Sequence, residues 1–409
     1  MERVLARCCG LDVHKETVAA GLIVPGAAGE RTETIRTFGT MTEDLLALRD
    51  WLAEHGCTHV AMESTGVFWK PVYYLLEDDF EVLLVNAAHI KNVPGRKTDV
   101  SDCAWIAQLL EHGLLHPSFV PPPEIRELRD LTRYRKALIL DRTREVNRVH
   151  KVLQDAGIKL SSVATDIMGI SGRAMLSCLI EGQQDPERLA DLAKGKLRSK
   201  MGPLRKALRG RFGSHHAFLL AEILSHIDYF DLSIERCSEQ ITEKLRPFTE
   251  AVALLVTIPG VDRKTVETIV AETGADMSRF PSAGHLASWA GMCPGNNESA
   301  GKRKSGKTRK GNRWLSIGLT EAALAASRSK DCYLRAQYYR IRTRRGHKKA
   351  VRAVAHSILV ITYHLLSKRV SYKDLGGDYF IRRDPQVRIR YLVRQLEQMG
   401  QRVTVESAA

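Results

Sequence analysis

The pattern of apolar and polar positions divides the chain into an N-terminal part that alternates strands with helices and a longer part that is mainly helical. Strand patterns cover residues 6–24, 31–39, 58–64 and 81–87, and helix patterns cover 42–56, 67–77 and 99–113. The prolines at 121–123 can continue neither a helix nor a central strand. We therefore predict an α/β domain over residues 1–116.

The next part of the chain has the apolar spacing of two long helices. Residues 125–156 place apolar side chains on one face and many arginines on the other, which predicts an amphipathic helix. From Ile223 to Leu245 apolar residues recur at spacings of 3 and 4, a seam of about three coiled-coil heptads. We predict a helical and coiled-coil region over 117–250 that links the outer domains and supports oligomerisation. The seam itself fits pairing within the chain or with another subunit.

A third part begins with two short helical patterns around a Pro-Gly turn, over residues 254–274. This pattern resembles a helix-hairpin-helix, whose turn amides and helix N-terminus hold a DNA phosphate without reading bases. An ordinary hairpin of two helices is the alternative. Further helix patterns follow at about 314–327 and 349–366. We predict a mainly α C-terminal domain over 251–375 and a tail over 376–409.

Charge is distributed unevenly along the chain, which has a formal net charge of +15. Residues 1–120 carry 10 Lys/Arg against 17 Asp/Glu, whereas the remainder carries 52 against 30. Between Ala300 and Arg352 there are 17 basic side chains and 2 acidic ones. Such a surface repels itself unless phosphates neutralise it, so we expect a nucleic-acid partner.

The lengths of the apolar runs and the spacing of the cysteines indicate where in the cell the protein is located. The longest apolar runs fall short of the roughly 18 residues that a membrane span needs, and no secretory signal pattern is evident. The eight cysteines show no CxxC pair and no zinc-ligand spacing, which is typical of reduced thiols. We expect no membrane association and a cytoplasmic, nucleoid-associated protein.

Four acidic residues of the α/β domain are candidates for metal binding. Asp12 lies in the first strand, Glu63 ends a later strand, and Asp99 and Asp102 share one face at the start of a helix. Carboxylates gathered in this way repel one another unless a cation lies between them, and their oxygens suit Mg²⁺ or Mn²⁺. Two such ions can clamp the attacking and leaving oxygens of a phosphodiester. The alternative for each acid is a surface residue or a helix cap, and Asp99 in particular could be only an acid at a helix N-terminus.

The stretch from Gly295 to Arg313 has little that can pack into a core. It contains four glycines, seven Lys or Arg, and the pair Glu298-Ser299. A serine in such a loop is usually only a loop residue, and its hydroxyl is a poor nucleophile until it is activated. The basic side chains, in contrast, are candidates for phosphate contacts: Lys302, Arg303, Lys304, Lys307, Arg309, Lys310 and Arg313.

The order strand-Asp, strand-Glu, helix-DxxD resembles the RuvC-type branch of the ribonuclease H (RNase H-like) fold. The whole chain is similar to DEDD transposases of the insertion-sequence-110 family, described as bridge-RNA-guided recombinases. The resemblance covers about residues 5–370. Six segments match in order: GLDVHK, MESTGVFWKP, KTDVSDCAWIAQLL, LRDLTRYRKALILDRTREVNRVHKVL, TIPGVDRKTVETIVAETG and FPSAGHLASWAGMCPGNNESAGKRKSGKTRKGNRWL.

The resemblance implies roles for individual residues. Asp12, Glu63, Asp99 and Asp102 match the family's metal-binding acids, and Ser299 matches its serine nucleophile, which becomes covalently linked to DNA. It also implies a composite site between the RuvC-like domain of one protomer and the serine domain of another. The assembly would be a dimer to tetramer around donor DNA, target DNA and a guide RNA encoded by the element.

Three other functions remain to be weighed against a site-specific recombinase. A RuvC-like junction-resolving endonuclease needs the four acids but no serine, and the large C-terminal part argues against so small a task. A sugar-kinase-like ATPase needs a glycine-rich phosphate loop after the first acid, and GLDVHKE has none. A binding-only remnant of a transposase would be expected to have lost one of the acids. All four acids and the serine are present. Together with the resemblance, they predict a metal-dependent, site-specific DNA recombinase.

Overall fold

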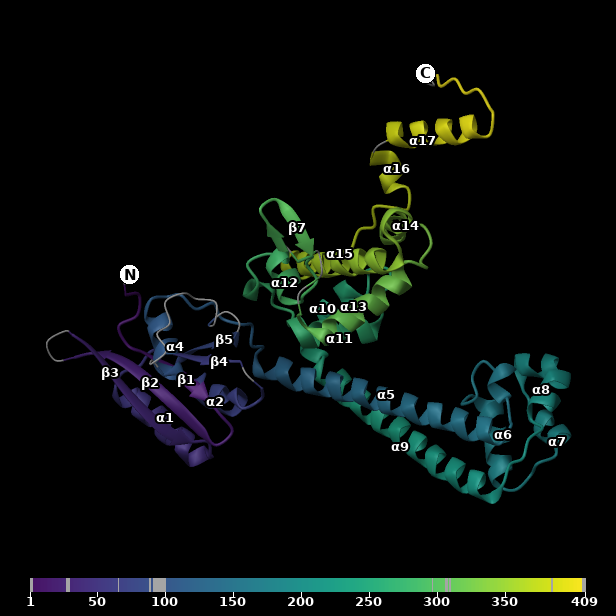
Figure 1. The fold of residues 1–409 in the computed structure, drawn as a ribbon, viewed down its shortest axis with the longest axis horizontal. Coiled ribbons are helices and arrows are strands. Elements are labelled where there is room, and N and C mark those ends of the chain that lie inside the picture. The colour runs from purple at the N-terminus through teal and green to yellow at the C-terminus, as the bar shows by residue number, and fades with distance from the viewer. Residues whose placement is uncertain are drawn as a thin grey trace. The chain divides into compact units, whose positions relative to one another are not determined.

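The computed structural model describes residues 3–26, 30–64, 66–87, 90, 101–295, 297–305, 308, 310–383 and 385–406, as drawn in Figure 1. The chain divides into two compact units, Met1–Val120 and Pro121–Ala409. The finer division that the sequence suggests, at residues 250 and 375, stays a prediction.

The N-terminal unit is built on a mixed five-stranded sheet in the order β3-β2-β1-β4-β5. Strands β1, β2 and β3 pair antiparallel, whereas β4 runs parallel to both β1 and β5. The strands are β1 (Cys8–Val13), β2 (Thr17–Pro25), β3 (Arg31–Gly39), β4 (His59–Glu63) and β5 (Glu81–Val85). The predicted α/β character of this region is thereby confirmed.

Helices cover both faces of this sheet. Successive side chains of a strand point to opposite faces, so neighbouring residues of β1 pack against different helices. On one face, Cys9 and Leu11 of β1 pack with α1 (Thr42–Glu54) and α2 (Trp69–Leu76). On the other face, Cys8 packs against α4 (Asp102–Glu111). The sheet is thus packed on a hydrophobic core on each face, and this packing holds the ends of β1 and β4 in a fixed register.

The second unit begins with a pair of long helices that lie side by side, α5 (Pro123–Asp155) and α9 (Ser214–Lys244) (Figure 1). The predicted seam pairs within the chain: Ile227 and Ile241 of α9 are buried, and Ile223 and Phe230 are half-buried. The two-helix region is therefore stabilised without a second subunit. Its predicted part in oligomerisation stays a prediction.

A small helical lobe joins the end of α5 to the start of α9. The structure has a compact core in which Leu176, Leu189 and Leu204 pack with Leu153 of α5 and Leu220 of α9. Its elements are η1 (Leu160–Ser162), α6 (Ile170–Ile180), α7 (Pro186–Asp191), η2 (Gly195–Lys200) and α8 (Met201–Ala207).

The rest of the second unit is a helical cluster around α15 (His347–Lys368), which packs against α10, α12, α13 and α14. Among the described residues, α15 alone is long and apolar enough to cross a bilayer by length and composition, and half of its apolar window is buried as in a core helix. The other elements are η3 (Arg246–Phe248), α10 (Thr249–Leu255), α11 (Arg263–Thr273), η4 (Met277–Arg279), α12 (Ala283–Trp289), β6 (Asn297–Ser299), β7 (Lys302–Ser305), α13 (Arg313–Ala326) and α14 (Tyr333–Arg345).

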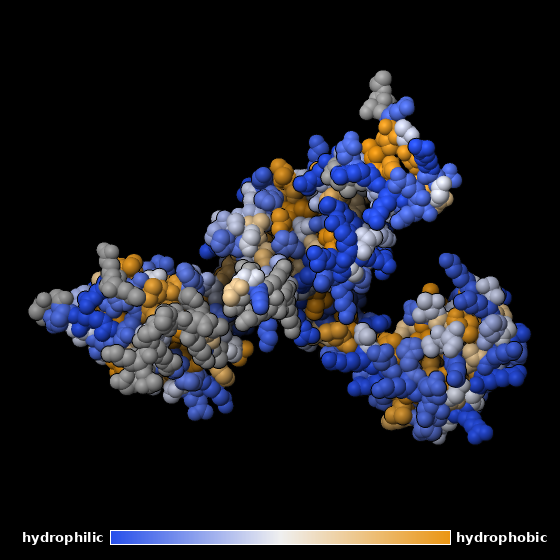
Figure 2. Space-filling view, turned by 45° about the horizontal axis from the view of Figure 1, so that its top comes forward, coloured by the Kyte–Doolittle hydropathy of each residue, from blue (hydrophilic) through white to orange (hydrophobic). Residues whose placement is uncertain are grey.

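Two helices follow in the predicted tail, α16 (Tyr379–Arg383) and α17 (Pro385–Gln398). Tyr391, Leu392 and Leu396 of α17 are exposed, and Figure 2 shows an orange, hydrophobic patch on this helix near the C-terminus. The described part of this chain leaves that apolar patch uncovered.

Candidate active site and nucleic-acid interface

Asp12 and Glu63 lie next to each other at the carboxyl ends of two parallel strands. The last register pair between β1 and β4 joins Leu11 to Met62, so the next residues along the two strands are Asp12 and Glu63. Neighbouring strands lie about 4.8 Å apart, and residues in register point to the same face. The sheet therefore holds these two carboxylates side by side.

Helix α4 brings a third carboxylate to the same edge. The face that carries Asp12 is the face of Cys8 and Gly10, which α4 covers. Cys8 lies opposite Ala107, whereas Gly10, further along β1, lies between Ala107 and Cys103. Helix α4 therefore runs antiparallel to β1. Its first residue, Asp102, lies toward the carboxyl ends of the strands. The structure thus gathers Asp12, Glu63 and Asp102. Asp99 lies outside the described residues.

The chemistry of this edge fits a hard divalent cation. The side chain of Asp12 is 28% exposed, and its Oδ2 lies 3.2 Å from Nε2 of His14. Glu63 is half-buried and Asp102 is exposed, so all three carboxylates can reach a solvated ion. Oxygen donors from aspartate and glutamate are the ligands that Mg²⁺ and Mn²⁺ prefer. Asp102 also begins α4, where the helix dipole favours an acid, so its position fits both proposed roles.

The close approach of α4 to the sheet depends on Gly10. A Cβ at this position would come within 2.3 Å of the backbone nitrogen of Ala107 and the backbone oxygen of Cys103. No side-chain movement can relieve a contact with helix backbone. Because α4 carries Asp102, the glycine also fixes where this acid lies relative to the strand ends.

Replacing Gly10 by Ala is expected to destabilise the N-terminal unit by about 1–3 kcal/mol, because α4 must move away from β1. Chemical denaturation followed by circular dichroism measures the change. Gly202→Ala in α8 is the control, since a Cβ there meets nothing within 4 Å and alanine favours the helix. Equal effects of the two substitutions would contradict a special role for Gly10.

Ser299 lies at the end of a strand directly before a tight turn. In the β6–β7 hairpin, Ser299 pairs with Lys302, and the two residues between them have positive φ, 51° at Ala300 and 72° at Gly301. Two positive φ values are the signature of a type I′ hairpin turn. The sequence did not predict this hairpin. The side chains of 297–299 lie outside the described residues.

Ala300 has an unusual backbone conformation for its residue type. A non-glycine residue with positive φ is uncommon, and such strain tends to be found at functional sites. Here it directly follows Ser299 in the chain. The turn therefore fixes the backbone at Ser299 more sharply than a flexible glycine loop does.

The basic residues that the sequence assigned to phosphate binding are described only in part. Lys302, Lys310 and Arg313 are exposed, as a surface for phosphates requires. The side chains of Arg303 and Lys304, and all of Lys307 and Arg309, lie outside the described residues. Their contacts with nucleic acid stay a prediction.

The helix-hairpin-helix-like element is present as α10, a turn and α11, but its turn faces the protein. A Cβ on Gly260 would come within 2.4 Å of the backbone nitrogen of Ala326 in α13. Asp262 accepts a hydrogen bond of 2.8 Å from the backbone N–H of Thr265 and so caps α11. Burial acts to raise the pKa of Asp262, but the hydrogen bonds from Thr265 hold it below its ordinary value. A carboxylate thus already occupies the helix end that a DNA phosphate would use.

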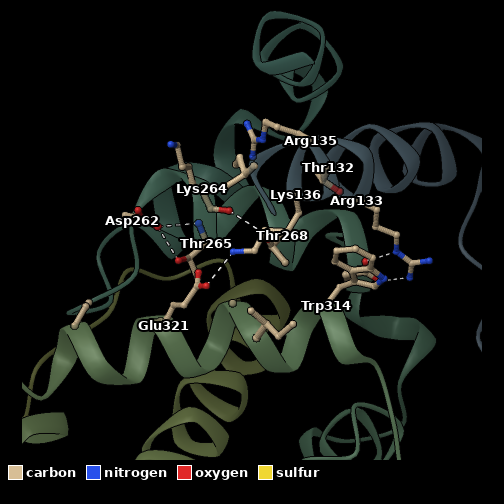
Figure 3. Close-up of a pocket in the computed structure, with 17 residues that line it drawn as sticks. Thr132, Arg133, Arg135, Lys136, Asp262, Lys264, Thr265, Thr268, Trp314 and Glu321 are labelled. Atoms are coloured by element: carbon tan, nitrogen blue, oxygen red, sulfur yellow. Dashed lines mark hydrogen bonds and ion pairs between the residues drawn. The ribbon is translucent and has the colours of Figure 1, made fainter. Parts of the chain in front are cut away.

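A cavity of about 230 Å³ lies where α5 meets α11 and α13 (Figure 3). Ion pairs cross it: Lys136 with Glu321 at 2.9 Å, and Arg133 with Glu272 at 2.8 Å. Arg135 pairs with Glu267 at 2.5 Å next to it, with both side chains buried. Because these cations already have carboxylate partners, we interpret the cavity as the joint between the long helix and the C-terminal helices. The arginine-rich face of α5 was the only sequence signal for it.

A second group of metal-ligating residue types, Asp155, His215 and His216, lies at the junction of α5 and α9, with ligand atoms within 4.8 Å of one another. Nδ1 of His216 accepts a hydrogen bond of 3.0 Å from the backbone N–H of Gly213, so Nε2 carries the proton. That nitrogen lies 2.9 Å from Oδ2 of Asp155, to which it donates. Both ring nitrogens are used, and this group stabilises the start of α9.

Comparison with known proteins identifies the family. A profile for DEDD transposase domains of the IS110 type, described as a transposase, matches residues 9–158. A profile described as the transposase IS116/IS110/IS902 family matches residues 252–340. The first covers the three gathered carboxylates, and the second covers Ser299. DEDD domains use divalent metal, in agreement with the oxygen donors at the strand ends.

Two relatives extend the match over most of the chain. The uncharacterized 42 kDa protein of insertion element IS900 from Mycobacterium paratuberculosis is 30% identical over 298 residues, 68% of this chain and 73% of the relative. The mini-circle putative transposase for IS117 from Streptomyces coelicolor is 24% identical over 407 residues, 90% of this chain and 95% of the relative. The chain therefore belongs to the IS116/IS110/IS902 family of transposases and is an enzyme that acts on DNA.

Proposed function

We propose that this transposase is a site-specific recombinase that cuts and rejoins DNA through a covalent link between Ser299 and a DNA phosphate. The observation that carries the proposal is the gathering of Asp12, Glu63 and Asp102 at one edge of the sheet, within a DEDD domain. The sheet order β3-β2-β1-β4-β5 is compatible with a RuvC-like fold.

Asp12, Glu63 and Asp102, together with Asp99, are the residues that would hold Mg²⁺ or Mn²⁺, as a pair of ions. When bound, the ions supply Lewis acidity and orient the phosphate oxygens. The carboxylates contribute the fixed frame. Two come from adjacent strands and one from a helix packed on those strands, so their spacing does not depend on a mobile loop.

Ser299 supplies the nucleophile. Its Oγ forms a bond to phosphorus as the bond from phosphorus to one strand oxygen breaks; the hydroxyl proton leaves and the released strand oxygen gains a proton. The phosphodiester energy is kept in the serine ester, so the strand can be rejoined without another energy source. Exposed Lys302, Lys310 and Arg313 near it in the chain neutralise the phosphates that approach.

The carboxylates and Ser299 belong to different compact units of the chain. The family resemblance supports a composite site in which the DEDD domain of one protomer meets the serine domain of another, in a dimer to tetramer. The same resemblance supports guidance by a bridge RNA. Base pairing then reads the target, and the protein needs mainly backbone contacts, which fits its excess of Lys and Arg.

The test is a covalent-adduct assay with supercoiled donor and target DNA, Mg²⁺ and RNA transcribed from the flanking non-coding region of the element. Ser305→Ala is the control variant, because Ser305 lies on the partner strand of the hairpin. Wild type and this control are expected to form a protein–DNA adduct. Ser299→Ala and Asp102→Ala are expected to form none. If Ser299→Ala still cuts DNA while Asp102→Ala does not, the serine assignment is wrong and the junction-endonuclease alternative takes its place.

A further inference from the structure

The corner between α14 and α15, residues 342–349, is strongly basic, and each of its residues is exposed. Helix α14 ends with Arg342, Arg344 and Arg345, Gly346 turns the chain with a φ of 81°, and Lys348 and Lys349 open α15. No acidic residue occurs in the sequence between Asp331 and Asp374. We call residues 342–349 the α14–α15 corner.

The cations of this corner have no acidic partners within the part of the chain that the structure describes. Some exposed basic residues elsewhere are paired with a carboxylate: Arg188 with Asp185, Arg279 with Asp276, and Lys244 with Glu127. Arg344, Arg345 and Lys348 form no such ion pair with a described residue. In addition, Lys348 and Lys349 lie in the first turn of α15, where the helix dipole disfavours positive charge. The corner thus concentrates charge that an outside anion would neutralise.

A hollow of about 210 Å³ lies beside the corner, between α13 and α15. Its lining contains no carboxylate and consists of Thr320, Leu324, His347, Lys348, Val351 and Arg352. Arg352 is half-buried, and it donates hydrogen bonds to Oγ of Ser316 at 2.7 Å and to the backbone oxygen of Gly291 at 2.5 Å. Both acceptors are neutral, so they leave its charge uncompensated. Burial lowers the pKa of Arg352, which reflects the cost of holding that charge.

The surroundings of the tyrosines of α14 indicate whether this surface binds single strands or a duplex. Unpaired strands are usually held by bases that stack on open aromatic rings. Here Arg335 lies 5.6 Å from the ring of Tyr339, and Arg342 lies 5.9 Å from the rings of both Tyr338 and Tyr339. Tyr338 is itself buried, and the exposed ring of Tyr339 has two guanidinium groups beside it, so α14 does not present a row of open rings for stacked bases. What remains is a set of cations on two rigid helices, which matches the regular phosphates of a duplex.

We propose that the α14–α15 corner, together with Arg352 in the adjoining hollow, binds the sugar-phosphate backbone of duplex DNA. The inference deepens the proposed function and rests on it, since it assigns a DNA-holding surface outside the segment Gly295–Arg313. The corner also lies beyond residue 340, where the match to the family profile ends. The surface contributes affinity without reading sequence, so it complements recognition by a guide RNA.

The test compares two triple variants of the full chain that remove the same charge. In the corner variant, Arg344→Gln, Arg345→Gln and Lys348→Gln are combined. In the control variant, Arg188→Gln, Arg279→Gln and Lys244→Gln remove three exposed cations that have carboxylate partners. Binding to a fluorescent 30-base-pair duplex DNA is measured by anisotropy in EDTA, at several salt concentrations, so that no cleavage contributes. The same measurement is made with single-stranded DNA and with duplex RNA.

We expect the corner variant to bind duplex DNA at least about tenfold more weakly than wild type at 0.15 M salt, and the control variant to change by less than about twofold. The slope of log K against log salt should fall by up to about 2.7, since each lost phosphate contact contributes about 0.9. Equal losses in both triples, no loss in the corner triple, or a loss confined to single strands or RNA would each overturn the proposal. The adduct assay with Ser299→Ala reports separately on the proposed function, because binding in EDTA needs neither metal nor serine.

Discussion

Asp12→Asn is expected to reduce metal-dependent DNA cleavage at least about 10³-fold while the protein still folds. The substitution keeps the shape of the side chain but removes the charge that would hold a divalent ion beside Glu63. A loss of about 4 kcal/mol of transition-state stabilisation, of the order that a bound metal supplies, corresponds to this factor. Nicking of supercoiled DNA across a Mg²⁺ titration measures it.

Glu16→Gln is the matched control for this prediction. Glu16 is an exposed carboxylate in the turn between β1 and β2, a few residues from Asp12, and it is not one of the acids assigned to the metal. We expect Glu16→Gln to cut DNA at nearly the wild-type rate. If Asp12→Asn kept wild-type cleavage at saturating Mg²⁺, Asp12 would not be a metal ligand. If Glu16→Gln lost as much activity, the effect would be one of general charge.

The elements of the N-terminal part could be predicted from the sequence because two simple periodicities govern them. Alternation along the strands placed Asp12 in the first strand and Glu63 at the end of a later one, and the helix pattern placed Asp102 near a helix start. What the sequence could not show is the direction in which α4 crosses the sheet. Nor could it show how closely α4 approaches β1, which depends on the missing side chain of Gly10, because no local pattern reports a contact with a helix far along the chain.

The C-terminal part shows why other elements were missed. Helix α14 has arginines on several sides and only Leu334 and Tyr338 buried, so it lacks the apolar stripe by which helices are found in a sequence. The β6–β7 hairpin turns at Ala300-Gly301, whereas Asn-Gly or Asp-Gly is the usual signal for such a turn. The coiled-coil seam on α9 was visible, but its partner was not, because apolar spacing does not say which helix it meets.

An ion pair at the joint between α5 and the C-terminal helices is a second contact whose partner could not be identified from the sequence. Arg135 and Glu267 lie 132 residues apart in the chain, yet their side chains are 7% and 5% exposed and meet at 2.5 Å. Nη1 of Arg135 also lies 3.4 Å from Oγ of Ser238, so one guanidinium joins α5 to both α9 and α11. In the sequence, Arg135 is only one of many arginines on a helix that is predicted to have a polar face.

Glu267→Leu is expected to destabilise the second unit by about 3–5 kcal/mol, because it leaves the charge of Arg135 buried without a carboxylate. The double variant Arg135→Leu with Glu267→Leu should regain most of that loss, since removing both charges leaves none to desolvate. Urea unfolding of the full chain measures the transition of this unit. Glu321→Leu is the control: its partner Lys136 lies on the same helix as Arg135, but Glu321 is 58% exposed, so we expect a change below about 1 kcal/mol. A Glu267→Leu variant no less stable than Glu321→Leu would show that the buried pair does not hold the joint together.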